Sequence, residues 1–581
     1  MQANVDQSYL RIIGQAALLL AAALCLYLPS LSFEFTLDDP LVTIMNQDIT
    51  APHPSYLEYF RTSLYHGTDA EAANRNLYRP IPKLSMVLNR QLNGGGFDPF
   101  GFHLVNIILY AFTVVSVFIF YRTAFRQMGE PAIAAFLAAV LFLVFPSHLE
   151  SVCNVKHREE IFACLFGILS WLLFLRESAQ PRQHWKSFLG ALFFLFALLS
   201  KESAVLLLPC LLIWEHLQDR LRRAEFFNHF AFYIGAGLIY ATLRITALKA
   251  IFSPSGTNLF FAPGEGLITR LGVSSWVFLR YYVLDQLVTF NLDPAFSSRE
   301  LLLRGDHANL RFFLCLAVVV VALCFLAWHT LYRRRTFAAW GLFFLITSFL
   351  TFNLIPIGTA GAFRLMFIPS VFLCGFMVLL IGRAYSKIAL RFRFERVQTI
   401  FSVIVALALI ILAYITHLRM GIWHDDGALF SYSGSLGQKN PLSLYAAGQY
   451  FDHVGNQDRK YSNYEQALEL FLKETQKEYL FDDRATVAFI IVATEIAYKK
   501  LGNDPQKAIE LADVAINQLN RLKQMRNRPL DENATAAYYV KALALKNQFR
   551  MSEAISVCKE GLAIGNHDGL RETLKALSTV P

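Results

Sequence analysis

Charged residues are scarce in this 581-residue chain. Asp, Glu, Lys and Arg make up 17% of the sequence and hydrophobic residues 55%, whereas soluble domains carry about 25% charged residues. The shortage is concentrated before about residue 420. The later part reads as water-soluble, so we expect a membrane domain at 1–420 and a soluble domain at 421–581.

Cysteine spacings typical of paired sites are also lacking, and the first apolar stretch lacks the pattern of a cleavable leader. The eight cysteines have no spacing typical of zinc or of a disulfide framework. The first apolar stretch, at 10–30, has almost no basic region before it and no small-residue cleavage site, so we expect a retained anchor. No stretch resembles a nucleotide-binding loop.

The net charge of +9 does not indicate nucleic-acid binding. Basic clusters lie between apolar stretches, at 122–127, 220–223, 332–336 and 391–396. Such loops stay on the cytoplasmic side of a membrane. We therefore expect the N-terminus inside and the loop after the first span outside.

The sequence is rich in long apolar runs. A run of about 20 apolar residues is long enough to cross a bilayer. We predict about eleven spans, near 10–30, 102–121, 131–147, 158–175, 187–200, 203–218, 227–244, 310–331, 337–354, 364–383 and 398–417. Residues 270–290 are also apolar but carry Arg280 and Asp285. Because charges inside a membrane are costly, we predict an interfacial or re-entrant helix there.

An acidic pair, Asp38 and Asp39, follows the first span by a few residues. Two acids at the lipid–water boundary favour a catalytic base of a membrane enzyme. The alternative is a helix cap or a turn formed by Asp-Asp-Pro.

The predicted outer loops collect further charges that have little reason to lie beside lipid: Arg79, Glu150, Lys156, Arg158, Glu160, Lys201, Glu202 and Arg364. Such a set suits a site that binds a lipid-linked phosphate and performs acid–base chemistry. The alternative is ordinary snorkelling of interfacial Lys and Arg. His103, His148 and His157 lack the spacing of a zinc cluster, so we interpret them as polar loop residues that could donate to sugar or phosphate.

Five stretches, in this order, resemble one family: LDDPLVTIMNQDIT, YRPIPKLSMVLNRQLNGGGFDPFGFHLVNIILY, FPSHLESVCNVKHREEIFACLF, LLSKESAVLLLP and NLIPIGTAGAFRLMFIPS. The chain resembles the transmembrane and tetratricopeptide-repeat O-mannosyltransferases, among the GT-C glycosyltransferases that use polyprenyl-phosphate sugars. The resemblance implies an all-α membrane protein with a GT-C-type bundle of many spans. One departure is Phe363, where the family has Glu before the last Arg.

The resemblance also implies roles for the charged residues. One acid of the pair Asp38–Asp39 is the catalytic base, and the donor phosphate is bound by Arg79, Arg158, Lys201 and Arg364. Residues that support these cations or hold the acceptor are Glu150, Glu160, Glu202, His103 and His148. No cofactor is implied, although two adjacent carboxylates are also a ligand set for a divalent metal ion.

The soluble part carries paired amphipathic helices at 462–476, 504–522 and 536–565. Ala467, Ala508 and Ala554 occupy the same small position in a similar context, which is typical of degenerate tetratricopeptide repeats. We expect this domain either to recognise the acceptor protein or to act as a rigid cap on the first outer loop. Asn533-Ala534-Thr535 fits a glycosylation sequon.

The resemblance implies an inverting membrane glycosyltransferase. The expected partners are a polyprenyl-phosphate-linked sugar, an exported protein acceptor bound by the repeats, and membrane lipids, with no nucleic acid. We expect a bacterial inner membrane with a periplasmic active site, or the endoplasmic reticulum lumen in a eukaryote. The alternatives are a transferase that modifies glycolipid or polysaccharide, and a non-catalytic membrane scaffold or transporter.

Overall fold

The computed structural model describes residues 2–69, 71, 77–177, 184–219, 224–249, 266–289, 310–352, 361–392, 395–436, 440–475, 483–525 and 535–578. Within these ranges the chain forms helices and connecting turns but no strand, so the predicted all-α class is confirmed there. The chain divides into two compact units, Met1–Asp425 and Asp426–Pro581. Parts of the predicted loops at 176–186, 219–225, 245–309, 353–364 and 384–397, and Asn533 and Ala534 of the sequon, lie outside the described residues.

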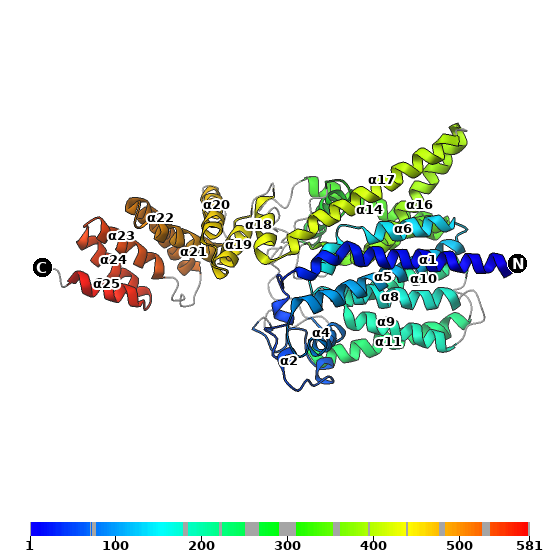
Figure 1. Ribbon diagram of the computed structural model, residues 1–581, viewed down its shortest axis with the longest axis horizontal. Coiled ribbons are helices and arrows are strands. Elements are labelled where there is room, and N and C mark those ends of the chain that lie inside the picture. The colour runs from blue at the N-terminus through cyan, green and yellow to red at the C-terminus, as the bar shows by residue number, and fades with distance from the viewer. Residues whose placement is uncertain are drawn as a thin grey trace. The chain divides into compact units, whose positions relative to one another are not determined.

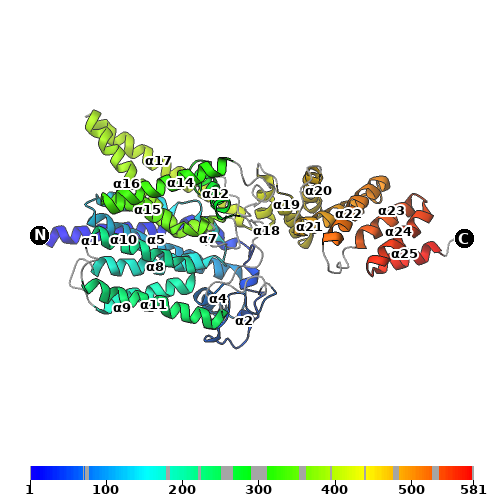
Figure 2. The ribbon, with the colours of Figure 1, turned by 180° about the vertical axis from the view of Figure 1, so that it is seen from behind.

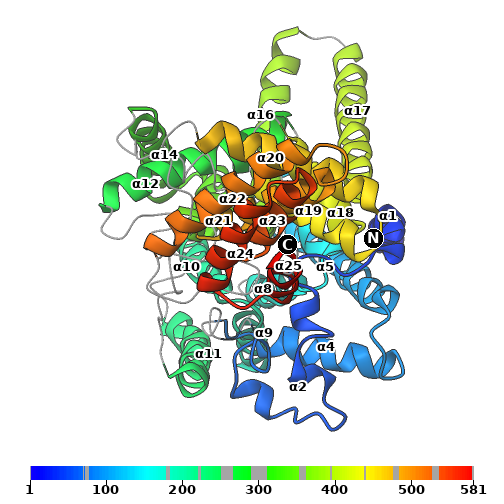
Figure 3. The same ribbon diagram turned by 90° about the vertical axis from the view of Figure 1, so that its left-hand side faces the viewer.

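The first unit is a helical bundle. Across it, α5 packs on α8, α8 packs on α9, and α9 packs on α11 (Figures 1 and 2). Its longer helices are α1 (Gln2–Tyr27), α5 (Pro99–Gln127), α6 (Ala132–Leu143), α8 (Arg158–Glu177), α9 (His184–Ser200), α10 (Leu207–Leu217), α11 (Ala224–Leu248), α12 (Leu267–Val277), α14 (Leu310–Ala327), α15 (Thr336–Thr347), α16 (Phe367–Phe392) and α17 (Glu395–Met420). Figure 3 shows α16 beside α17 on one flank, and α12 beside α14 on another.

Further helices of the first unit lie between or after those already given. They are η1 (Leu28–Ser32), η2 (Pro40–Val42), α2 (Gln47–Thr50), η3 (Glu58–Phe60), α4 (Pro80–Leu92), α7 (His148–Cys153), η4 (Glu202–Leu206), η5 (Phe278–Thr289), η6 (Trp328–Tyr332), η7 (Phe349–Phe352), η8 (Phe363–Met366) and η9 (Gly421–Trp423). Of these, α2 and α4 lie at the end of the bundle opposite the N-terminus of the chain (Figure 1).

Six of the described helical stretches are long and apolar enough to cross a membrane: Tyr9–Ser32, Pro99–Gln127, His229–Leu248, Leu310–Tyr332, Phe363–Ala389 and Gln398–Trp423. Shorter apolar helices cover Ala132–Leu143, His184–Ser200 and Thr336–Thr347. The chain is thus an integral membrane protein, while the predicted number of eleven spans stays a prediction.

The segment at 270–290 is helical through α12 and η5. Its two charges meet, because the Arg280 guanidinium pairs with the buried carboxylate of Asp285. This pairing explains how an apolar segment tolerates both charges. The segment is not among the six membrane-length stretches, and its interfacial placement stays a prediction.

The loop after the first span has a small apolar core of its own, formed by Val42, Ile49, Tyr59, Leu64, Tyr65, Met86, Val87, Phe102 and Val155. Polar contacts reinforce it. The buried Lys83 ammonium donates to Asp48 Oδ2 at 2.5 Å and to the Ser63 carbonyl at 3.0 Å, and His66 Nδ1 lies 2.8 Å from the same Asp48 oxygen. The loop is therefore a fixed platform that can hold the Asp38–Asp39 turn.

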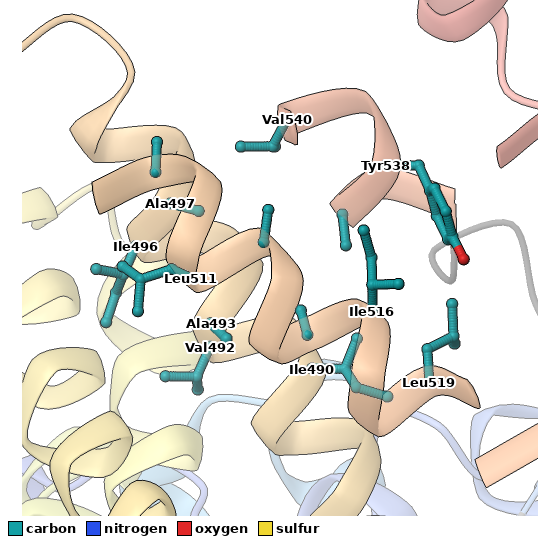
Figure 4. Packing of buried hydrophobic residues seen from close by; sticks show 14 of the residues in the cluster. Ile490, Val492, Ala493, Ile496, Ala497, Leu511, Ile516, Leu519, Tyr538 and Val540 are labelled. Atoms are coloured by element: carbon teal, nitrogen blue, oxygen red, sulfur yellow. The ribbon is translucent and has the colours of Figure 1, made fainter. Parts of the chain in front are cut away.

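The second unit is a row of antiparallel helices, each packed on the next: α18 (Asp426–Ser435), α19 (Pro441–His453), α20 (Gln457–Thr475), α21 (Asp483–Lys500), α22 (Pro505–Met525), α23 (Ala536–Asn547), α24 (Met551–Ile564) and α25 (Asp568–Ser578). In addition, α19, α21, α23 and α25 contact one another in sequence and form one layer. Figure 4 shows the apolar core between α21, α22 and α23. Ala467, Ala508 and Ala554 are fully buried on α20, α22 and α24, whereas the assignment to tetratricopeptide repeats stays a prediction.

Candidate active site

Asp39 anchors the acidic turn to the bundle. Its Oδ2 accepts a hydrogen bond from the Thr36 N–H at 3.1 Å, and its Oδ1 accepts one from the Lys156 N–H at 2.6 Å. The side chain is completely buried. Burial raises the pKa of Asp39 to about 7, even though the backbone hydrogen bonds favour the ionised form. Both carboxylate oxygens are thus engaged by the protein itself.

Asp38 points elsewhere, and its side chain is 45% exposed. The preceding residue, Leu37, has φ of +53°, a conformation uncommon for a residue with a side chain. This turn separates the two carboxylates, so that one faces the interior and the other faces solvent. The ammonium of Lys156 lies 3.8 Å from Asp38 Oδ2.

A chain of alternating charges continues from Lys156. Its Nζ lies 3.4 Å from Glu159 Oε1, which in turn accepts a hydrogen bond of 2.5 Å from Arg79 Nη1. Arg79 also donates to both oxygens of Glu202, at 2.8 and 3.3 Å. Asp38, Lys156, Glu159, Arg79 and Glu202 therefore form a ladder in which every charge faces the opposite sign.

Two more ion pairs flank this ladder. Lys201 pairs with Glu160, and Arg364 pairs with Glu150 through its guanidinium. The Arg364 N–H also donates to Glu150 Oε2 at 2.9 Å. A carboxylate thus lies beside Arg364 although Phe363 replaces the acid that the family has next to this arginine.

Each of these side chains sits where the backbone changes from one helix to another. Arg79 precedes α4, whose first turn carries Pro80 and Pro82, and Glu159 lies in the first turn of α8. Lys201 has an extended backbone between α9 and η4. The local sequence therefore ends or begins a helix at these points, and charges separated by up to 214 residues meet.

The ladder shifts the proton affinity of its members. Burial lowers the pKa of Lys156, and Glu159 and Asp38 offset part of this effect. Burial alone would raise the pKa of Glu202, but the charge and hydrogen bonds of Arg79, together with the Lys201 charge, outweigh it and bring that pKa to about 2. Buried ion pairs are weak evidence for stability, because desolvation cancels much of the attraction. Clusters of perturbed groups beside accessible polar surface are candidates for function.

Three residues predicted for the site lie apart from this ladder. Arg158 is fully buried and donates to Asn106 Oδ1 at 2.6 Å and to Asn89 Oδ1 at 2.9 Å. It therefore joins α8 to α5 and α4. His148 lies between Tyr110 OH and Ser370 Oγ, at 2.9 and 2.8 Å.

Burial lowers the pKa of His148 to about 3, so this imidazole is neutral at physiological pH. His103 is also buried, with its ring centroid 6.3 Å from that of Phe33. The structure thus brings together Asp38, Asp39, Arg79, Glu150, Glu160, Lys201, Glu202 and Arg364 but not Arg158, His103 or His148.

Sequence reasoning missed Glu159 and gave no phosphate-binding role to Lys156. The available signal was their spacing of three residues, which brings Lys156, just before α8, close to Glu159 in the first turn of α8. Their contacts with Asp38 and Arg79 depend on the tertiary fold.

A narrow crevice lies beside the Lys201–Glu160 pair. Its polar end carries Glu160, Lys201 and Ser203, and its other lining residues include Leu350, Leu365 and Ile368. The space measures about 10 Å³, which is room for about one water molecule and far below the size of a ligand pocket. Among the described side chains, no three of the types His, Cys, Asp and Glu are close enough to share a metal ion. The metal alternative at Asp38 and Asp39 stays a prediction.

No model of a protein family matches the chain. In sequence, the chain is similar to mouse "Protein O-mannosyl-transferase TMTC1", with 33% identity over 231 residues that cover 37% of this chain and 24% of the relative. It is also similar to human "Protein O-mannosyl-transferase TMTC4", with 25% identity over 499 residues that cover 75% of this chain and 64% of the relative. The predicted resemblance to the transmembrane O-mannosyltransferases is confirmed, and the chain spans less than two thirds of the length of either relative.

Among solved structures, the archaeal oligosaccharyltransferase AglB from Archaeoglobus fulgidus, in complex with an inhibitory peptide and a dolichol-phosphate, matches with a TM-score of 0.41 and 14% identity. The match covers 78% of this chain and 59% of AglB.

Proposed function

We propose that this chain is a membrane glycosyltransferase of the GT-C type. It would move one sugar, mannose or another hexose, from a polyprenyl-phosphate carrier to a Ser or Thr hydroxyl of an exported protein. The observation that carries this proposal is an accessible carboxylate, Asp38, beside a cluster of cations in a chain with several membrane-length helices. The similarity to protein O-mannosyl-transferases supports O-mannosyl transfer.

Asp38 acts as the general base. Its carboxylate takes the proton of the acceptor hydroxyl while the hydroxyl oxygen attacks the anomeric carbon. The bond between that carbon and the carrier phosphate breaks, and the phosphate leaves with the electron pair from the opposite face, so the configuration inverts. Asp38 is preferred over Asp39 because a base must reach the proton it abstracts, and both oxygens of the buried Asp39 accept backbone hydrogen bonds.

Arg364 is the first choice for contact with the donor phosphate. Its side chain is 20% exposed, compared with 4–6% for Arg79, Lys156 and Lys201. A guanidinium has five donors, so Arg364 keeps some for phosphate while Glu150 holds the rest. A cation placed where the leaving phosphate gains charge stabilises the transition state. Lys201 would serve the same phosphate at the polar end of the crevice.

Arg79 and Lys156 have a positioning role in this scheme. Lys156 faces Asp38, and Arg79 fixes Glu159 behind Lys156. Arg158 would have a structural role. Its hydrogen bonds to Asn106 and Asn89 hold the start of α8, and thereby the neighbouring Lys156 and Glu159, in place.

The remaining parts of the proposal concern architecture. The first unit would cross the membrane about eleven times, with the acidic turn and the second unit on the outer side, periplasmic in a bacterial inner membrane. The second unit would be a tetratricopeptide-like stack that recognises the acceptor protein. The layer of α19, α21, α23 and α25 supports this role, because repeat stacks of this kind offer a continuous inner surface.

The test is a transfer assay with the purified full chain in nanodiscs. Polyprenyl-phosphate mannose, glucose and related donors are offered with Ser/Thr peptides, with and without EDTA, to wild type and to Asp38→Asn. Transfer by wild type alone, unaffected by EDTA, supports the proposed base. Loss of transfer in EDTA favours the metal alternative. Donor hydrolysis without transfer would keep the enzyme and reject the peptide as acceptor, and no turnover of any donor by folded wild type would reject the proposal.

A further inference from the structure

We infer that the basic turn Arg333–Arg335, together with the apolar crevice beside it, binds one anionic phospholipid. The crevice lies between α10 and η6 and is lined by Leu212, Ile213, His216, Leu331 and Tyr332. It takes no part in the proposed transfer reaction, because η4 begins at Glu202 and the crevice residues lie beyond η4, from the middle of α10 onward. Leu212, Ile213 and His216 follow the first residue of α10 by five to nine positions, which corresponds to about 8–14 Å along the helix axis.

Arg334 latches the basic turn onto the end of α10. Its guanidinium donates to both oxygens of Asp219, at 2.9 and 2.5 Å, and to the His216 carbonyl at 2.9 Å. Arg334 and Asp219 both have positive φ, at 52° and 56°. Two residues with a left-handed backbone conformation, joined by a bidentate ion pair, give this turn a specific geometry. The Arg334 contact reaches His216, which lines the crevice, and so forms one of its edges.

The neighbouring Arg333 and Arg335 do not take part in the contact with Asp219 and His216. Arg333 and Arg335 are exposed, and within the described part of the chain neither guanidinium has an ion pair or a hydrogen bond. The latch therefore holds two available guanidinium groups next to Tyr332, which lines the crevice. Guanidinium groups bind phosphate oxygens in a bidentate manner.

The surroundings favour a lipid as the occupant. Leu331 is 45% exposed and Tyr332 is 69% exposed, on a helix that is long and apolar enough to span a membrane. The Tyr332 ring stacks on Trp328 with a centroid distance of 4.2 Å. Exposed Trp and Tyr at the end of a membrane helix lie at headgroup level, so an acyl chain would enter the crevice while Arg333 and Arg335 hold the phosphate.

Charge complementarity selects an anionic headgroup. Two free cations beside an apolar crevice match a lipid with net negative charge, such as phosphatidylglycerol, and a zwitterionic lipid leaves part of that charge unmatched. Positive charge near the ends of membrane helices marks the cytoplasmic leaflet, and the lipid would bind from that leaflet.

Native mass spectrometry of the full chain tests this inference. The detergent-solubilised protein is titrated with phosphatidylglycerol or phosphatidylcholine, and retained lipid is counted after collisional activation. Arg333→Gln/Arg335→Gln should lower phosphatidylglycerol occupancy about tenfold and leave the Arg334 latch intact. The matched control is Arg126→Gln/Lys387→Gln, which removes two other exposed charges that lack ion pairs among the described residues. Equal losses in both variants, or equal retention of both lipids by wild type, would overturn the site.

A second variant tests the crevice rather than the charge. Ile213→Trp should fill the crevice and lower phosphatidylglycerol retention, whereas Leu238→Trp, at a 63% exposed position on α11, should not. Thermal unfolding of each variant checks that the chain is folded. Unchanged retention by folded Ile213→Trp would contradict the proposed acyl-chain pocket.

Discussion

The main-chain N–H of Lys156 donates a hydrogen bond of 2.6 Å to Asp39, which lies 117 residues earlier in the chain. The ammonium of the same lysine lies 3.8 Å from Asp38. One residue thus engages both members of the acidic pair, with its backbone fixing one carboxylate and its side chain facing the other. This division gives the two aspartates different properties, which substitutions can separate.

Asp38→Asn should abolish transfer while sparing the fold. The side chain is partly exposed and its one ion pair, with Lys156, is long, so the variant should unfold within about 1 kcal/mol of wild type. Loss of a general base lowers kcat by about 10²–10⁴-fold. Single-turnover transfer and thermal unfolding are measured together. Full activity in this variant would remove Asp38 from the role of base.

Asp39 should make the stability of the chain depend on pH. Folded Asp39 keeps its proton up to about pH 7, whereas its ordinary pKa is 3.8. Between these values the folded state binds the proton more tightly, so raising the pH from 4 to 7 lowers the free energy of unfolding, by an amount on the order of a few kcal/mol. Unfolding of wild type and Asp39→Asn is compared at pH 5 and pH 8.

The asparagine variant lacks this titration, so its stability should change less between the two pH values than that of wild type. The test compares how much the free energy of unfolding changes with pH in wild type and in Asp39→Asn, because other groups titrate in both proteins. An identical pH dependence would mean that Asp39 does not hold a proton in the folded chain at pH 5.

Much of the candidate site could be predicted from local sequence. The position of Asp38 just after an apolar span, and of Lys201 between two others, follows from hydropathy and charge alone. Partners could not be predicted in this way. That Glu159 faces Arg79 while its neighbour Arg158 turns toward Asn106 depends on which face of α8 meets α4, α5 and the first loop.

The histidines show the same limit. His148 and His103 look like loop donors in the sequence, since each lies near a predicted membrane boundary. In the structure, the burial of α7 places His148 against Tyr110 and Ser370, where it fills a polar gap between helices. The packing of α7 determines where the His148 side chain lies, and a single sequence carries no direct signal for that packing.

Gly448→Ala should destabilise the second unit. An added Cβ at this position of α19 would lie 2.2 Å from Cε1 of Tyr464 on α20. That ring is buried and stacked on Tyr445, so it cannot move away easily. Overpacking of this kind costs about 1–3 kcal/mol. The measurement is the modification rate of Cys558, a fully buried thiol in the same unit, followed by peptide mass spectrometry of the full chain.

Gly502→Ala is the matched control, because nothing lies within 4 Å of a Cβ added there. Faster modification of Cys558 in Gly448→Ala than in Gly502→Ala is expected. Equal rates would mean that close approach of α19 and α20 at Gly448 does not limit the stability of this unit.

Arg364 and Glu150 allow binding and folding to be distinguished. Arg364→Gln leaves Glu150, whose side chain is 3% exposed, without its guanidinium partner. Breaking a buried pair on one side costs about 3–5 kcal/mol, so this variant should unfold at a lower temperature. Glu150→Gln/Arg364→Gln removes both charges and should recover most of the lost stability.

Recovery of donor binding should not accompany recovery of the fold. If Arg364 binds the phosphate, the double variant is folded but retains at least tenfold less polyprenyl-phosphate sugar than wild type, measured by native mass spectrometry. Glu150→Gln alone keeps the cation and should bind the donor at least as well as wild type, because the carboxylate no longer competes with phosphate. Wild-type affinity in the double variant would mean that Arg364 and Glu150 form a structural pair only, and the phosphate contact would move to Lys201.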